Sequence, residues 1–330
     1  MLAEDLGLYQ SLVIAADNTN GGRMSANKII SGVNSNVFPP ILSPERLAET
    51  VTLRKTFFKV NDADDGTGFV PKIFLDGDAQ GDDYCVFWPG TQRDTQADIT
   101  GSERFYTAGL LDADVSAGAN TLTVAVKDLE QVDGFQNGDT IRISNKALYN
   151  SGTGTEQYLT VNADPVVVDN VLTLTFDEPL LMPYAAGSKV SSVYEPADIA
   201  CSLDGTGFTG GADIDFAAIV LGNVGTTDED YTATFTDATH YTVTGDSLGA
   251  IGSGTTGADF SPMHPSWSSP RFTIPAAAFD GLTISAGDTF SFSTHPASVP
   301  IWEKKTNPAD ATETNSNYLW LIMRVEAVAS

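Results

Sequence analysis

Short runs of aromatic and β-branched residues, separated by glycine- and aspartate-containing turns, set the hydrophobic pattern of this chain. In its clearest stretch, three such runs cover residues 53–60, 69–75 and 84–88. The two turns between them, at residues 61–68 and 76–83, are acidic and contain glycine. Runs bounded by Gly, Asp and Asn in this way are typical of antiparallel strands. We therefore expect these residues to open a β-sandwich that the rest of the chain interrupts and then completes.

The stretch from residue 109 to residue 193 predicts a second β unit. Leu122, Val124 and Val126 occupy alternate positions, which is the period-2 pattern of a strand. The Asn-Gly pair at residues 137–138 is a strong hairpin signal. Several short strands within so few residues favour a small barrel or a compact sheet.

Residues 194–330 return to sandwich-like strands. The glycine-rich segment 245–257 predicts a loop among them. In the last run, residues 318–325, apolar side chains occupy both faces, which predicts a strand that is central or has one face in an interface. No window of useful length has helical periodicity. The predicted fold class is therefore all-β: an Ig-like β-sandwich with an inserted small β-barrel or β-sheet module.

The first 50 residues are the least regular part of the chain. Strands are predicted near residues 8–16 and 24–33, and the segment Phe38-Pro39-Pro40 favours an extended path. Two alternatives stay open, namely an extended arm that lies on a neighbouring protein and an edge strand followed by a linker. The predicted divisions of the chain are an N-terminal arm (1–50), the first part of the sandwich (51–108), the inserted module (109–193) and the completing part of the sandwich (194–330).

The net charge restricts the partners that we expect. The chain has 43 acidic and 17 basic residues, a net charge of −26, whereas its hydrophobic content of 42% is ordinary for a globular protein. A surface this negative repels phosphates, so nucleic acid is not expected as a partner. No run approaches the roughly 20 apolar residues of a membrane helix, and the N-terminal residues lack a signal-peptide pattern. We expect a protein that is made in the cytoplasm and stays soluble or assembles there.

Acidic turns provide the candidate metal site. Asp62 and Asp64 lie in the first turn, and Asp76 and Asp78 lie in the second. Hard oxygen ligands clustered in flexible turns suit Ca²⁺, although neither turn matches an EF-hand loop. The alternative is a pair of solvated turns that keep the surface soluble. No other cofactor is expected.

Catalytic signatures do not stand out in the sequence. His240, His264 and His295 do not have the spacing of metal ligands, and neither an HExxH nor a GxSxG motif occurs. A glycosidase pair needs two carboxyl groups about 5–10 Å apart, and with 43 acidic residues no single pair is informative. Cys85 is expected in the core, and a disulfide with Cys201 is the less favoured alternative. The sequence therefore predicts a non-enzymatic protein.

Two segments resemble a known family. The first is LYQSLVIAADNTNGGRMSANKIISGVNSNV at residues 8–37, which leads into LRKTFFKV at residues 53–60. The second, residues 286–308, contains PIWEKK and precedes the final apolar strand. Together they resemble virion structural proteins of tailed bacteriophages and prophages. The resemblance implies an Ig-like sandwich, assembly with copies of itself and with other virion proteins, and no catalytic residue.

The resulting prediction is a non-enzymatic structural protein of a tailed-phage virion, first of all a tail-tip or baseplate protein that attaches neighbouring tail proteins or fibres. A capsid decoration or head–tail joining protein, and a receptor- or carbohydrate-binding sandwich, are the alternatives. Aromatic side chains often dominate protein interfaces. The residues expected at interfaces are Phe38, Pro39, Pro40, Ile301, Trp302 and Trp320, with core packing as the alternative for the two tryptophans.

Overall fold

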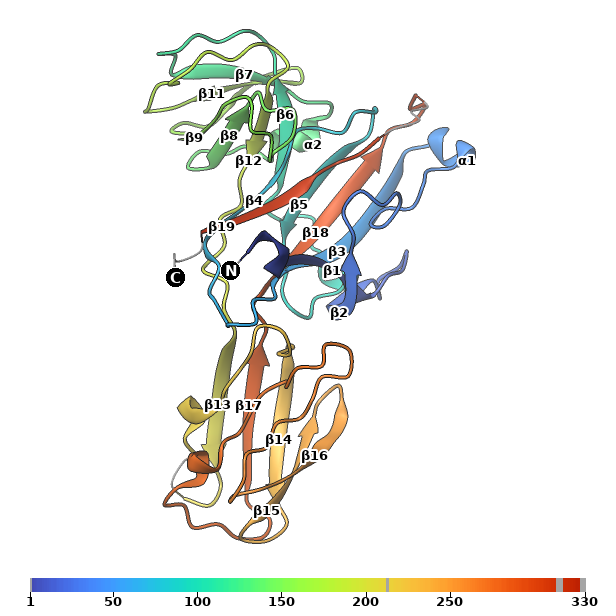
Figure 1. Ribbon diagram of the computed structural model, residues 1–330. Helices are drawn as coiled ribbons and strands as arrows, with labels where there is room; N and C mark the ends of the chain where they lie inside the picture. Colours follow the sequence, from blue (N-terminus) through green and yellow to red (C-terminus); the bar gives the residue numbers. More distant parts are fainter. Residues whose placement is uncertain (1, 212–213, 313–316, 327–330) are drawn as a thin grey trace.

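Three β bodies follow one another along the molecule in Figure 1, with a barrel module at the top, a central body in the middle and a C-terminal sandwich at the bottom. The computed structural model describes residues 2–211, 214–312 and 317–326. Strands take up 44% of the chain and helices 6%, so the predicted all-β class is confirmed. Within the described residues, no helix is long and apolar enough to cross a membrane.

One antiparallel sheet forms the base of the central body. Its middle strands are β3 (Thr50–Val60), β18 (Ser298–Asn307) and β5 (Tyr84–Pro89), with β18 between the other two. The register of β18 on β3 runs from Ser298 opposite Lys59 to Asn307 opposite Thr50. The end of the chain thus completes a sheet that its beginning opens.

A hairpin made by the first thirty residues lies at the edge of this sheet. After the short 3-10 helix η1 (Ala3–Asp5), β1 (Leu6–Val13) pairs with β3 on one side and with β2 (Gly21–Ile29) on the other. The β1–β3 ladder ends where Gln10 lies opposite Thr56, so the tip of the hairpin extends beyond it. A loop and the one-turn helix α1 (Ser43–Arg46) then lead into β3. Of the two alternatives for this part of the chain, the structure therefore shows the edge strand, as a hairpin at residues 6–29, and not the extended arm.

A two-stranded ribbon of β4 (Phe69–Leu75) and β19 (Leu321–Glu326) lies between the central sheet and the barrel module. Met323 packs on the central sheet in the same cluster as Ile301. Ile322 points the other way and packs with Phe74 and with Val193 of the barrel module. Both apolar faces of the predicted strand thus pack within the chain, but β19 is not central in a sheet, because among the described strands it pairs only with β4.

The barrel module has a core of its own. Its strands are β6 (Tyr106–Leu111), β7 (Thr121–Ala125), β8 (Thr140–Ser144), β9 (Glu156–Thr160), β10 (Val166–Val168), β11 (Val171–Thr175) and β12 (Lys189–Ser192), with the short helix α2 (Leu129–Val132). The strand order is β10-β11-β7-β6-β12-β8-β9, and a bridge between Val161 and Phe176 brings the two ends together. Because β6 also pairs with β5, the backbone ladder continues from the barrel module into the central sheet.

The C-terminal sandwich forms a separate five-stranded sheet. Its order is β13 (Ser202–Phe208), β17 (Thr289–His295), β14 (Glu229–Phe235), β15 (His240–Gly245) and β16 (Gly249–Thr255). A second, irregular layer covers it through bridges such as Val220 to Thr273. Aromatic side chains fill the space between the layers, with Tyr231 and Phe272 rings 4.7 Å apart. The remaining 3-10 helices are η2 (Gln96–Asp98), η3 (Phe216–Ala218) and η4 (Ala276–Phe279).

Most of the glycine-rich segment 245–257, which was predicted as a loop, is the strand β16, with turns at residues 246–248 and 256–257. β16 pairs with β15 along most of this segment. A Cβ atom on Gly254 would lie 2.5 Å from the Tyr241 ring, so this position needs glycine for close packing. Glycine in a strand often marks such an approach, and composition alone does not separate it from a loop.

Candidate functional site

The two acidic turns of the predicted calcium site lie at opposite ends of a strand. Asp62 and Asp64 precede β4, and Asp76 and Asp78 follow it. Seven residues of extended strand span roughly 20 Å, so the two pairs of carboxylates are too far apart to share one ion. Among the residues that the structure describes, no group of three or more His, Cys, Asp or Glu side chains could hold a metal ion.

A lysine of the barrel module occupies the centre of the second turn. The Lys127 ammonium donates to the carbonyl oxygens of Ala79 (2.5 Å), Gly81 (2.6 Å) and Asp83 (2.9 Å). It also lies 3.4 Å from the Asp78 carboxylate. Burial raises the pKa of Asp78 to about 6, although Lys127 opposes that rise. The carbonyl and carboxylate oxygens that would have to bind a calcium ion in this turn therefore already contact the Lys127 ammonium.

Asp76 has cationic partners as well. Its carboxylate accepts hydrogen bonds from Arg142 (2.9 Å) and Lys189 (2.7 Å), both in the barrel module. In the first turn, Asp62 accepts from the backbone N–H of Asp64 (3.1 Å). The predicted metal residues therefore lie in two places with different roles, and those of the second turn connect the central body to the barrel module.

The residues expected at interfaces also separate into two groups. Pro39 and Pro40 are exposed in the loop before α1, and Phe38 beside them is half-buried. Ile301 and Trp302, by contrast, are 0% exposed in β18. The Trp302 indole stacks on Trp88 at 6.4 Å and donates to Asp94 at 2.8 Å. Ile301 and Trp302 are therefore buried core residues. Of these five residues, only those of the proline-containing loop are accessible to a partner.

Trp320 lies where the ribbon meets the barrel module. It is half-buried beside Tyr149, with the ring centres 6.5 Å apart. This ring contact is internal to the chain. It lies beside the first of two charged contacts that connect the bodies, and we call that charged contact the barrel joint.

The barrel joint (Asp76, Arg142, Lys146, Glu156, Lys189 and Arg324) buries its charges. The Arg142 guanidinium donates to Asp76 at 2.9 Å and to Glu156 at 2.8 Å, and the Arg142 and Asp76 side chains are both 0% exposed. Arg324 of the ribbon donates to Glu156 at 2.7 Å. Burial would raise the pKa of Glu156, but hydrogen bonds from Arg324, Arg142 and Lys146 outweigh it and hold the pKa at about 2. Glu156 therefore stays ionised across the whole physiological pH range.

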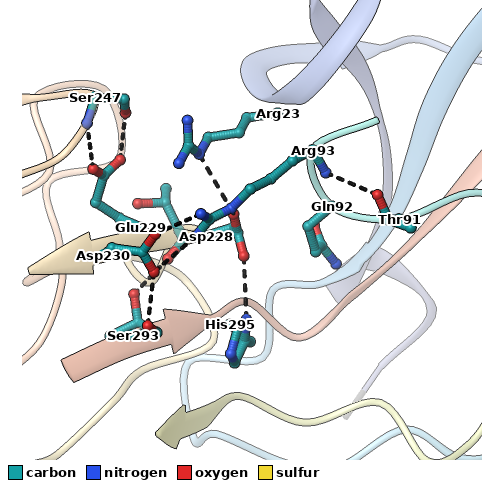
Figure 2. Close-up of polar contacts among 12 residues, drawn as sticks. Arg23, Thr91, Gln92, Arg93, Asp228, Glu229, Asp230, Ser247, Ser293 and His295 are labelled. Atoms are coloured by element: carbon teal, nitrogen blue, oxygen red, sulfur yellow. Dashed lines mark hydrogen bonds and ion pairs between the residues drawn. The ribbon is translucent and has the colours of Figure 1, made fainter. Parts of the chain in front are cut away.

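The second charged contact, the sandwich joint (Arg23, Lys59, Asp65, Arg93, Asn223, Asp228, Asp230 and His295), connects the central body to the C-terminal sandwich. Figure 2 shows Arg93 between Asp228 and Asp230 at the start of β14. Its loop is fixed by the neighbouring Asp94, which pairs with Lys55 at 2.6 Å. Hydrogen bonds from Arg93 and Ser293 lower the pKa of Asp230 to about 2. The same figure shows His295 on Asp228, at 3.1 Å.

A buried lysine completes the sandwich joint. Lys59 of β3 donates to the carbonyl oxygens of Asn223 and Val224 and lies 4.9 Å from the Trp267 ring centre. Burial lowers the pKa of Lys59 to about 8. On the opposite side of the loop, Asp65 accepts from the Asn223 N–H at 2.7 Å. One loop of the sandwich is thus held between two elements of the central body.

A cavity of about 550 Å³ lies beside this joint. Apolar side chains such as Leu203, Phe216 and Ile219 line it, together with Asp65 and Cys201. Cys201 and Cys85 are free thiols, so the alternative of a disulfide between them is excluded.

Exposed hydrophobic side chains concentrate in the N-terminal part of the chain. Of the 22 large hydrophobic side chains exposed in the described part, nine belong to the first 51 residues. They are Leu2, Leu12, Val13, Ile14, Ile30, Val33, Leu42, Leu47 and Val51. This part of the chain is also nearly neutral, since residues 1–60 hold six basic and five acidic residues, against 11 basic and 38 acidic in residues 61–330. We call these nine side chains the N-terminal apolar surface.

Comparisons with known proteins give no family: no protein-family model matches the chain, and no curated sequence is similar to it.

Proposed function

We propose that this chain is a non-enzymatic structural protein of a tailed-phage virion that joins copies of itself and other virion proteins. The observation that supports it is the N-terminal apolar surface on a chain that is otherwise strongly acidic. These side chains are spread from the residue before η1 to the start of β3, and exposed apolar area of this kind marks sites of protein–protein contact. The two segments that resemble phage virion proteins supply the setting, with a tail tip or baseplate as the first choice.

The arrangement of the bodies supports an assembly role. Each of the three β bodies has its own hydrophobic core, and charged contacts connect the bodies to one another. The exposed loop with Pro39 and Pro40 adjoins the N-terminal apolar surface, so a partner seated there would contact both. Proline fixes the extended backbone in advance and lowers the entropy lost on binding.

Carbohydrate or receptor binding through an aromatic face has less support. Such a face would expose several aromatic rings on one side of a sandwich. Of the described aromatic residues, Tyr318 alone is exposed, at 47%. It lies next to the ribbon, outside the C-terminal sandwich.

The test is to locate the chain in purified particles. Phage-like particles released by the source cells are purified and analysed by peptide mass spectrometry, and the chain is located on them by immunogold labelling. We expect the chain in the particles with the label at the tail tip. Label on the head or neck would support the decoration or joining alternative. A chain abundant in the lysate but missing from the particles would contradict the proposal.

A further inference from the structure

The sheet of the C-terminal sandwich has a free edge at β13. Figure 1 shows β13 at one edge of this sheet, and among the described strands it pairs only with β17. The ladder is regular over residues 202–206, after which its register shifts. Gly205 and Gly207 are both exposed. Because glycine has no side chain, the exposed atoms are those of the backbone, so this edge of β13 is accessible to a further strand.

The cavity of about 550 Å³ lies beside this edge, between the two layers of the sandwich. Leu203 and Gly205 line it from the sheet, and Phe216 and Leu221 line it from the second layer. Gly205 lies opposite Phe292 of the aromatic core, so it faces the second layer, where a Cβ atom on it would lie 2.3 Å from the Phe216 ring. Protein interiors are ordinarily close-packed. The core of the sandwich is therefore incomplete beside β13.

A strand added to β13 would place side chains in this space. Successive side chains of a strand point to opposite faces, and those of paired strands lie side by side. Every second side chain of an added strand would therefore point between the layers, next to Leu203 and Gly205, and the others would point to solvent. Backbone hydrogen bonds give such an added strand its affinity, and pockets for alternate side chains give it specificity.

Acidic groups predominate at this edge. Asp65 lines the cavity, and the Asp204 side chain of β13 is 82% exposed. His295 contacts both Asp204 (3.3 Å) and Asp228 (3.1 Å), so it supplies at most one positive charge for two carboxylates. Among the described residues that line the cavity, none is a lysine or an arginine. A basic partner is therefore favoured, because complementary charge steers association and suppresses wrong partners.

We propose that the free edge of β13 binds an extended segment of another virion protein by strand addition, and that apolar side chains of this segment fill the cavity. The inference rests on the proposed assembly function and names the chemistry of one partner, a segment in which apolar residues alternate with lysine or arginine. A second copy of the chain has the same net charge of −26, so a partner of opposite charge is a different protein.

The other edge of the sheet, at β16, offers less to an added strand. Gly249 has a φ of 70°, far from that of a regular strand, and the ladder with β15 shifts its register between Val243 and Thr244. None of the residues of β16 lines the cavity. Irregular edges of this kind hinder further pairing, so β16 provides the matched control for β13.

Synthetic peptides test the edge on the full chain. Three seven-residue peptides, as long as β13, alternate lysine with valine, leucine or phenylalanine, and binding is measured by isothermal titration calorimetry. For each of them, a peptide of the same composition with its lysines and its apolar residues in two blocks is the control. We expect at least one alternating peptide to bind several-fold more tightly than its block control. If none does, the proposal is overturned.

Filling the cavity tests where the peptide binds. Ala217 lines the cavity and is exposed, so Ala217→Phe adds a ring there without replacing a buried side chain. Ala250→Phe is the matched control, since Ala250 is exposed in β16. We expect Ala217→Phe to weaken peptide binding several-fold and Ala250→Phe to bind like wild type. Unchanged binding by Ala217→Phe would contradict the insertion of side chains into the cavity.

Cys201 gives a second readout, on the wild-type chain, because it also lines the cavity. Cys201 is half-buried, whereas Cys85 is 2% exposed and serves as the internal control. The rate at which iodoacetamide alkylates each thiol is followed by mass spectrometry. We expect saturating peptide to slow the alkylation of Cys201 several-fold and to leave Cys85 unchanged. An unchanged rate at Cys201 would place the peptide elsewhere and overturn the proposal.

Thermal unfolding shows whether Ala217→Phe is folded, and protection of Cys201 in wild type carries the test if it is not. The outcome is independent of the particle experiment. A chain that occurs in particles but binds no alternating peptide would overturn strand addition and leave the assembly function standing. A chain that binds the peptide but is missing from particles would do the reverse. Self-association that Ala217→Phe abolishes and Ala250→Phe does not would assign the edge to a second copy and overturn the proposed partner.

Discussion

The barrel joint and the sandwich joint use the same residue types in different surroundings. In the barrel joint, the Arg142 and Asp76 side chains are completely buried. Backbone pairing between β5 and β6 also connects the central body directly to the barrel module. In the sandwich joint, the Arg93 and Asp230 side chains are 39% and 44% exposed. No strand of the described five-stranded sheet pairs with a strand of the central sheet.

This difference decides what each ion pair is worth. Removing one partner of a buried pair leaves an uncompensated charge and costs about 3–5 kcal/mol. An exposed pair is screened by water and salt and contributes about 0–1 kcal/mol. The buried Arg142–Asp76 pair therefore helps to fix the barrel module on the central body, whereas the exposed Arg93–Asp230 pair contributes little to the sandwich joint.

The largest expected effect comes from Arg142→Met. The substitution keeps much of the side-chain volume but leaves Asp76 and Glu156 without their shared guanidinium. We expect a loss of about 3–5 kcal/mol in the free energy of unfolding, measured by chemical denaturation. Arg93→Met is the matched control in the sandwich joint and should cost no more than about 1 kcal/mol. Equal losses in the two variants would remove the distinction between the joints.

A pH titration of Lys59→Met sharpens the comparison, because Lys59 is the buried cation of the sandwich joint. Its pKa is about 8 in the folded state against 10.5 for an ordinary lysine. Between these values the unfolded chain binds more protons, so stability rises with pH across this window and is lower below pH 8. Relative to the variant, wild type should gain up to about 3 kcal/mol from pH 8 to 10.5. Parallel curves would contradict the assigned burial.

Lys127→Met tests the second acidic turn. The substitution removes the ammonium from the carbonyl oxygens of Ala79, Gly81 and Asp83 and should cost about 2 kcal/mol, measured as above. Because Lys127 already supplies the cation, adding a chelator to wild type should leave its melting temperature unchanged. A lower melting temperature in chelator would instead support a bound calcium ion, which stabilises the folded state that binds it.

The smallest expected effect is that of salt on the two joints. At 1 M salt the screening length falls to about 3 Å, which weakens exposed pairs much more than buried ones. Hydrogen exchange should therefore increase around Asp230 and in the connection at residues 195–201, while the barrel joint near Arg142 keeps its protection. Salt-induced exchange that is larger at Arg142 than at Asp230 would contradict the difference assigned to these two ion pairs.

Hydrophobic pattern predicts the strands of this chain well where apolar runs end in polar turns. The predicted segment at residues 69–75 coincides with β4, and that at 84–88 falls within β5. The β16 segment was predicted as a loop because it is rich in glycine. In the structure, Gly254 instead allows close packing against the Tyr241 ring, a contact that the local sequence does not reveal.

The charged joints could not be predicted from the sequence. Arg93 meets Asp228 and Asp230, which are far away in the chain, and 17 basic residues could each pair with any of 43 acidic ones. The acidic turns were recognised, but their internal cation, Lys127, comes from another body. Trp302 fits an interface anchor and a core residue equally well in sequence, and only the sheet around it shows that it is buried.

The most direct test of the account is the native mass of the wild-type chain as a function of concentration, with and without chelator. We predict that the mass rises above that of the 34.9 kDa protomer as concentration increases, and that chelator does not change it. A monomer at every concentration would contradict the proposal that the chain joins copies of itself. An association that disappears in chelator would contradict the assignment of Lys127 as the cation of the acidic turn.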